Sequence, residues 1–73
     1  DPEVAHIASL SEREREIIAL LCQGMPNKQV ASKLSISEVT VRYHLGHIYQ
    51  KLRVDGRLEL VIYAFRHGLA KPK

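Results

Sequence analysis

Signals that begin and end helices divide this chain into short segments, and they constrain its fold more than any other feature. The run Ser11-Glu12-Arg13-Glu14 has the S-x-x-E spacing of a capping box, in which the first and last residues each satisfy a free backbone N–H. Apolar residues at helical spacing follow, and Gly24 then supplies a stop. The pattern predicts a helix over about 12–23.

The same kinds of signal predict three more helices. Pro26 breaks the chain, and Asn27 is a good cap for a short helix over 28–34. Ser37 can cap a third helix, over 38–52. Its apolar stripe consists of Val41, Leu45, Ile48 and Leu52. After a turn, a fourth helix over 57–67 ends at Gly68. We therefore expect an all-α, four-helix, bundle-like domain.

The length of 73 residues allows one small core, which we place in residues 10–69. Residues 1–9 are expected to be a flexible N-terminal segment or the remnant of a linker, and residues 70–73 a C-terminal tail. Because the chain opens with Asp1 and not with Met, we expect it to be a piece of something longer.

Positive charge is concentrated in the middle of the chain. Between residues 26 and 57, six Lys and Arg face two Asp and Glu, which gives a balance of +4, and the sequence pI is about 9.3. This distribution fits a polyanionic partner. The alternative is an ordinary solvated basic surface.

Several classes of protein are disfavoured. One cysteine, Cys22, makes no internal disulfide, and no apolar run is long enough to span a membrane or serve as a signal peptide, so we expect a cytoplasmic protein. His44 and His47 lie three apart, but no Cys, Asp or Glu completes a zinc site, and a partly buried structural role is expected for His44. We expect no enzyme, cofactor, metal or small-molecule ligand.

The spacing of Ala31, Ser35 and Val41 is typical of a helix-turn-helix: a small residue where two helices meet, a small residue in the turn, and an aliphatic one that fixes the second helix. Any compact helical protein has small and aliphatic residues at such places. The short turn and the local positive charge favour the DNA-binding interpretation.

The second helix of this helix-turn-helix, predicted over 38–52, would present an outer face opposite its apolar stripe. At 100° per residue that face carries Val39, Tyr43, Gly46 and Gln50, flanked by Arg42 and His47. Arg42 has the fork that fits guanine, and Val39 and Tyr43 could contact thymine methyl groups or phosphates. Gly46 fits either close approach to DNA or a tolerated surface glycine.

A family resemblance is carried by the run LSEREREIIALLCQGMPNKQVASKLSISEVTVRYHLGHIYQKLRV, followed by Arg57 and a helix that ends in HGL. Over about residues 10–69 the chain resembles the LuxR/FixJ-type (GerE-like) DNA-binding domain of bacterial transcription regulators. The resemblance implies that the third helix enters the major groove and that the fourth can pair two domains. By position, it implies base-facing roles for Arg42, Tyr43 and Gly46, and phosphate contacts for Asn27, Lys28, Thr40 and Lys51. Val39 is expected to face bases from its own place on the outer face of that helix. Val39 stands where the family often has Lys or Arg, and Gly46 where it often has Ser or Lys.

The fourth predicted helix carries more apolar residues than one core needs. We expect Leu58, Val61, Ile62 and Phe65 to pack on the core. Leu60, Tyr63 and Ala64 would then form a dimer contact, unless they widen the core stripe. The sequence thus predicts specific binding of double-stranded DNA by an output domain, with weak homodimerisation mainly on DNA and RNA polymerase as a candidate partner. The alternative is a helical interaction module that works through residues 57–67.

Overall fold

Five α-helices and no strand make up residues 1–71, the part of the chain that this computed structural model describes. The helices are α1 (Pro2–Ala8), α2 (Glu12–Cys22), α3 (Asn27–Leu34), α4 (Glu38–Leu52) and α5 (Arg57–Arg66). The all-α prediction is confirmed, and the bounds of α2 to α5 agree with the expected ones to within one residue. Pro72 and Lys73, the end of the predicted tail, lie outside the described residues.

Local hydrogen bonds account for the starts of α2 and α4. The Ser11 amide donates to Glu14 Oε1 at 2.7 Å, and the Glu14 amide donates to Ser11 Oγ at 3.1 Å, so both halves of the capping box form. At the start of α4, the Thr40 amide donates to Ser37 Oγ at 3.0 Å. The signals that predicted these two helices are therefore the contacts that begin them.

The first helix, α1, corrects the expectation that residues 1–9 form a flexible segment. Asp1 caps it by accepting the Glu3 amide at 3.0 Å, and Pro2 occupies the first turn, where its missing N–H costs nothing. A seven-residue helix is marginal alone, so contacts with the rest of the domain must stabilise it. Arg15 supplies one of them by donating to the Ile7 carbonyl at 2.8 Å.

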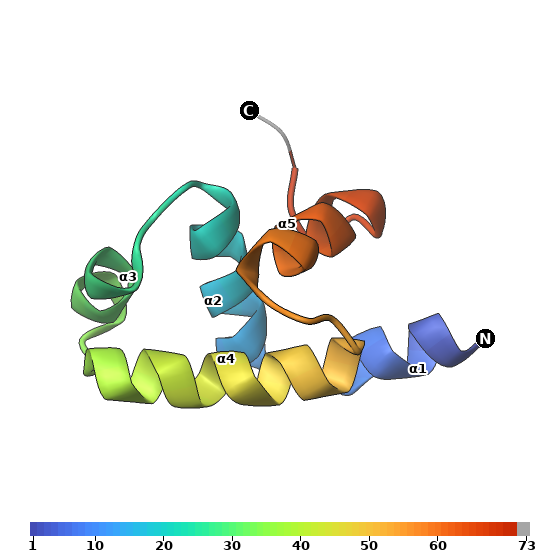
Figure 1. The fold of residues 1–73 in the computed structure, drawn as a ribbon, viewed down its shortest axis with the longest axis horizontal. Helices are drawn as coiled ribbons and strands as arrows, with labels where there is room; N and C mark the ends of the chain where they lie inside the picture. Colours follow the sequence, from blue (N-terminus) through green and yellow to red (C-terminus); the bar gives the residue numbers. More distant parts are fainter. Residues whose placement is uncertain (72–73) are drawn as a thin grey trace.

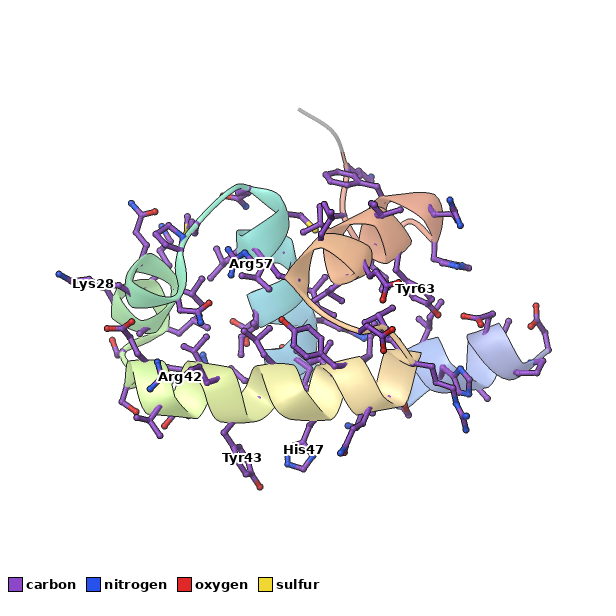
Figure 2. All side chains as sticks on the ribbon, viewed as in Figure 1. Lys28, Arg42, Tyr43, His47, Arg57 and Tyr63 are labelled. Carbon is purple, nitrogen blue, oxygen red and sulfur yellow. The ribbon has the colours of Figure 1, made fainter. Side chains whose placement is uncertain are left out.

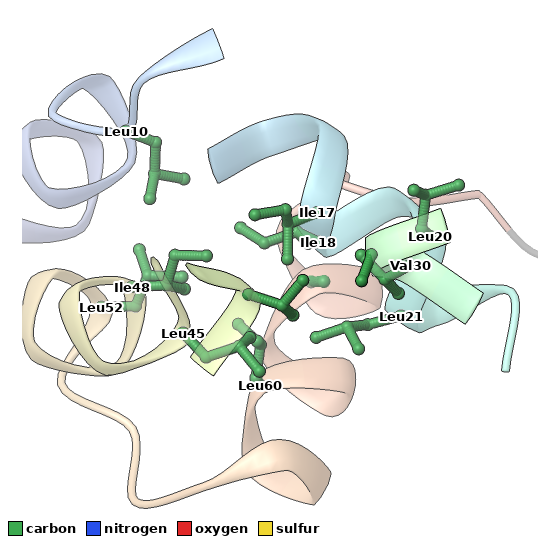
Figure 3. Packing of buried hydrophobic residues seen from close by; sticks show 13 residues of the cluster. Leu10, Ile17, Ile18, Leu20, Leu21, Val30, Leu45, Ile48, Leu52 and Leu60 are labelled. Carbon is green, nitrogen blue, oxygen red and sulfur yellow. The ribbon is translucent and has the colours of Figure 1, made fainter. Parts of the chain in front are cut away.

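The longest helix, α4, runs along one edge of the molecule, with α3 beside its N-terminal end and α1 beside its C-terminal end (Figure 1). The helix α2 packs against α3, α4 and α5. Side chains of α2, α4 and α5 meet in the core (Figure 3). The buried apolar residues are Leu10, Ile17, Ile18, Leu20, Leu21, Val30, Ala31, Val41, Leu45, Ile48, Leu52, Leu60 and Ala64.

The predicted inward face of α5 is wrong. Leu60 and Ala64 are fully buried, whereas Leu58 is 74% exposed, Ile62 47% and Phe65 38%. Both sets recur at helical spacing, so periodicity alone cannot tell which of two apolar faces packs against α2. Leu60 and Ala64 therefore belong to the core and cannot form the predicted dimer contact.

Candidate nucleic-acid interface

Helices α3 and α4 meet through the three-residue turn Ser35-Ile36-Ser37. Ser35 adopts the left-handed conformation at φ 57° and ψ 42°, and the Ile36 amide closes the turn by donating to the Ala31 carbonyl at 3.0 Å. Ala31 and Val41 are both buried, one on each helix. These are the positions expected of a helix-turn-helix, so its three predicted key residues are confirmed in their places.

The two faces of α4 are divided as predicted. Val41, Leu45, Ile48 and Leu52 are buried. On the opposite side Val39 is 66% exposed and Tyr43 is 65% exposed. Figure 2 shows Tyr43 and His47 projecting from α4 away from the rest of the molecule. This outer face is a convex helical surface of the width that the major groove admits.

Two features distinguish the middle of the outer face. The rings of Tyr43 and His47 meet at an angle of 64° with centroids 4.6 Å apart, a geometry typical of aromatic pairs. The two residues lie about one turn apart, so their rings pack against each other on the surface of α4. Beside them, a Cβ atom added to Gly46 would meet nothing within 4 Å. Packing within residues 1–71 therefore gives no reason for a glycine at this position.

The N-terminal end of α3 differs from the prediction. The helix begins at Asn27 and its cap residue is Pro26, with no side-chain cap bond, so the predicted capping role of Asn27 is wrong. The Asn27 side chain instead accepts a hydrogen bond from Arg57 Nη1 at 3.0 Å, and Arg57 Nη2 donates to the Met25 carbonyl. Lys28 extends outward from α3 into solvent (Figure 2). Arg57 thus ties the start of α5 to the start of α3.

Lys51 is already paired within the chain. Its ammonium lies 2.7 Å from the buried Glu14 carboxylate and donates to the Ser9 carbonyl at 3.0 Å. Burial alone would raise the pKa of Glu14, but the bond from Lys51, the Ser11 amide and the Lys51 charge together hold that pKa below its ordinary value. A phosphate that took this ammonium would leave a buried carboxylate unpaired. Lys51 is therefore held by contacts within the chain, whereas Lys28 extends into solvent.

The remaining predicted residues lie in less decisive places. The Thr40 hydroxyl lies 2.9 Å from Ser37 Oγ in the first turn of α4, next to the start of the outer face. His44 is half-buried, as expected, and Cys22 is half-buried against the core. Tyr63 is also half-buried, and its hydroxyl donates to the Glu3 carboxylate of α1.

The described residues offer no group of three or more His, Cys, Asp or Glu that could hold a metal ion. None of the helices described for residues 1–71 is long and apolar enough to cross a membrane.

Comparison with known proteins agrees with this geometry. Residues 8–64 match the model of the family described as bacterial regulatory proteins, luxR family. The chain is 39% identical over 63 residues to the nitrate/nitrite response regulator protein NarL of Escherichia coli, and 45% identical over 60 residues to the response regulator protein VraR of Staphylococcus aureus. These matches cover 86% and 82% of this chain, which spans 29% of the length of each relative.

Two solved structures share the fold. The transcription factor GerE is 40% identical with a TM-score of 0.78, and the match covers 85% of this chain and 92% of GerE. The response regulator ChrA of a heme-sensing two-component system is 51% identical with a TM-score of 0.79, and the match covers 84% of this chain and 30% of ChrA. With the helix-turn-helix and the matched family model, these likenesses settle the classification: the chain belongs to the luxR family of bacterial regulatory proteins.

Proposed function

We propose that this chain binds double-stranded DNA in a sequence-specific manner, as the output domain of a signal-controlled bacterial transcription regulator in the cytoplasm. The observation that carries the proposal is the solvent-exposed outer face of α4, which is the second helix of the helix-turn-helix closed by the turn at Ser35. Similarity to NarL, VraR and ChrA, which are named as response regulators, supports control by a signal.

Base reading is assigned to the outer face of α4. A helix of this kind lies in the major groove with its N-terminal residues against base edges, and Val39, Arg42 and Tyr43 all lie in the first two turns. Arg42 is exposed, and its guanidinium can donate to both O6 and N7 of a guanine. It therefore supplies the most selective single contact on this face.

Phosphate binding is assigned to the start of α3 and the first turn of α4. Lys28 is an exposed cation, and the first backbone amides of α3 lack a side-chain cap because Pro26 precedes them. Asn27 and Thr40 lie at the same two helix starts. These groups would fix the orientation of α4 in the groove without reading sequence.

Pairing of two copies on DNA is assigned to the exposed apolar face of α5, formed by Leu58, Ile62 and Phe65. A patch of three side chains is small, and stable interfaces bury roughly 1,000 Å² or more. We therefore expect pairing to depend on two half-sites that hold the copies at high local concentration. RNA polymerase, the other expected partner, would bind a surface of the domain that does not contact DNA.

The test compares Arg42→Ala with Lys28→Ala on a preferred duplex, found by selection from random sequences, and on an unselected duplex. Arg42→Ala should cost about 1 to 3 kcal/mol of binding free energy on the selected duplex and less on the other, because a bidentate base contact discriminates. Lys28→Ala should weaken both duplexes alike and flatten the dependence of log affinity on log salt by about one unit. Lys33→Ala, an equal loss of charge at the other end of α3, is the control. A chain that selects no sequence contradicts the proposal.

A further inference from the structure

Beside Arg42, the outer face of α4 presents two largely apolar side chains, Val39 and Tyr43, and this limits what those two positions can recognise. Val39 and Tyr43 lie four residues apart, both about two-thirds exposed at 66% and 65%, and they are among the most exposed large apolar side chains of the described residues. The one acidic residue of α4, Glu38, starts the helix and lies about 100° around its axis from Val39 and further from Tyr43. The face therefore lacks the carboxylates that would accept from cytosine.

The groups that base edges present in the major groove determine which of them an apolar side chain can contact favourably. Among the groups that the four bases present in the major groove, the 5-methyl group of thymine is the apolar one. The Val39 side chain has no hydrogen-bonding atom, so placing it against a polar base edge would strip water from that edge without replacement. Against a methyl group the same contact is favourable.

The neighbouring residues support close contact. Gly46 leaves bare backbone beside Tyr43, with space for a ligand because an added Cβ would meet nothing within 4 Å. The His47 ring packs edge to face with the Tyr43 ring, with centroids 4.6 Å apart. Four residues of helix rise about 6 Å, so Val39 and Tyr43 meet different base pairs.

Resting on the proposed function, we propose that Val39 and Tyr43 read thymine in the half-site through its 5-methyl group, beside the guanine bound by Arg42. At the base pairs that Val39 and Tyr43 contact, the domain then prefers thymine because of its methyl group and not because of its hydrogen-bonding atoms.

The experiment uses a duplex selected from a random library by this chain. Each thymine is replaced in turn by deoxyuridine, which deletes the methyl group and keeps every hydrogen-bonding atom. We expect affinity to fall about fourfold at each thymine that is read, the loss expected for one buried methyl group. Replacements in the flanks should leave affinity unchanged.

Protein variants assign each methyl group to its reader. Val39→Ala should weaken binding to the thymine duplex and remove the uracil penalty at one position, and Tyr43→Ala should do the same at another. Val4→Ala is the matched control, because Val4 is 64% exposed on α1 and undergoes the same change. Helical circular dichroism spectra check that all variants fold.

The outcomes separate this inference from the proposed function. A selected duplex that binds equally well with uracil at every position overturns the inference and leaves sequence-specific binding intact. Uracil penalties that persist in both Val39→Ala and Tyr43→Ala overturn the assignment to these residues. A chain that enriches no sequence overturns the proposed function and the inference together.

Discussion

At the residue scale, Gly46 is a stability cost placed on an otherwise regular helix. A glycine inside a helix destabilises it by roughly 0.5–1 kcal/mol relative to alanine, and no neighbour within 4 Å requires its absence of a side chain. We expect Gly46→Ala to raise the free energy of unfolding in urea by that amount and to lower affinity for the selected duplex. Stabilisation without loss of affinity would show that DNA does not approach this backbone closely.

The exposed side of α4 could be predicted from the sequence, whereas the polar contacts between residues far apart in the chain could not. The exposure of Val39 and Tyr43 follows from helical periodicity, a local property. The partners of Lys51 and Asn27 do not, since Glu14 and Arg57 lie 37 and 30 residues away in the chain. An assignment by position places a side chain on a helix, but it cannot tell whether its polar atoms are already satisfied within the fold.

At the element scale, the turn between α3 and α4 holds a serine where a glycine fits better. Ser35 has φ 57°, a conformation that costs residues with a Cβ atom roughly 1 kcal/mol or more. We expect Ser35→Gly to raise the free energy of unfolding by about 1 kcal/mol. Ser32→Gly, inside α3, is the matched control and should lower it. If urea denaturation shows that both substitutions raise, or both lower, the free energy of unfolding, this explanation of Ser35 is contradicted.

The two apolar faces of α5 give a second prediction at this scale. Leu58→Asp should leave the fold and single half-site binding intact, because Leu58 is exposed, and should abolish cooperative occupancy of a duplex with two half-sites. Leu60→Asp should unfold the domain, because it would bury an unpaired charge. Circular dichroism and gel-shift titrations measure both effects. Cooperative binding by folded Leu58→Asp would place the pairing surface elsewhere.

The α5 register shows a further limit of sequence reasoning. The helix itself was predictable from its apolar spacing and from Gly68, but its orientation depends on the packing partner, α2. Likewise, α1 is stabilised by tertiary contacts that a seven-residue sequence does not signal.

At the scale of the whole molecule, Tyr63 and Glu3 join α5 to α1 across 60 residues of chain. Burial raises the pKa of Tyr63 to about 12, helped by the hydrogen bond to Glu3 and by the Glu3 charge. Because the folded state holds this proton more tightly than the unfolded state, the stabilisation is complete below pH 10 and is lost as pH rises from 10 to 12.

We therefore expect the free energy of unfolding, measured in urea, to fall between pH 10 and 12 more steeply in the parent chain than in Tyr63→Phe, which keeps the ring and lacks the titrating hydroxyl. Tyr49→Phe, a half-buried tyrosine on α4, serves as the comparison variant. If the free energy of unfolding falls equally with pH in the parent chain and in Tyr63→Phe, the ionisation of Tyr63 does not contribute to the stability of the domain.

The solvent-exposed face of α4 has a consequence for how such a domain diversifies. Substitutions at positions 39 and 43 alter no buried contact of the core, and replacing Gly46 by alanine changes stability by at most about 1 kcal/mol, so the folding cost of changes on this face is small. Changes of target sequence can therefore arise at these positions with little loss of stability. A library randomised at these three positions should consist mostly of folded members that differ in the DNA they prefer.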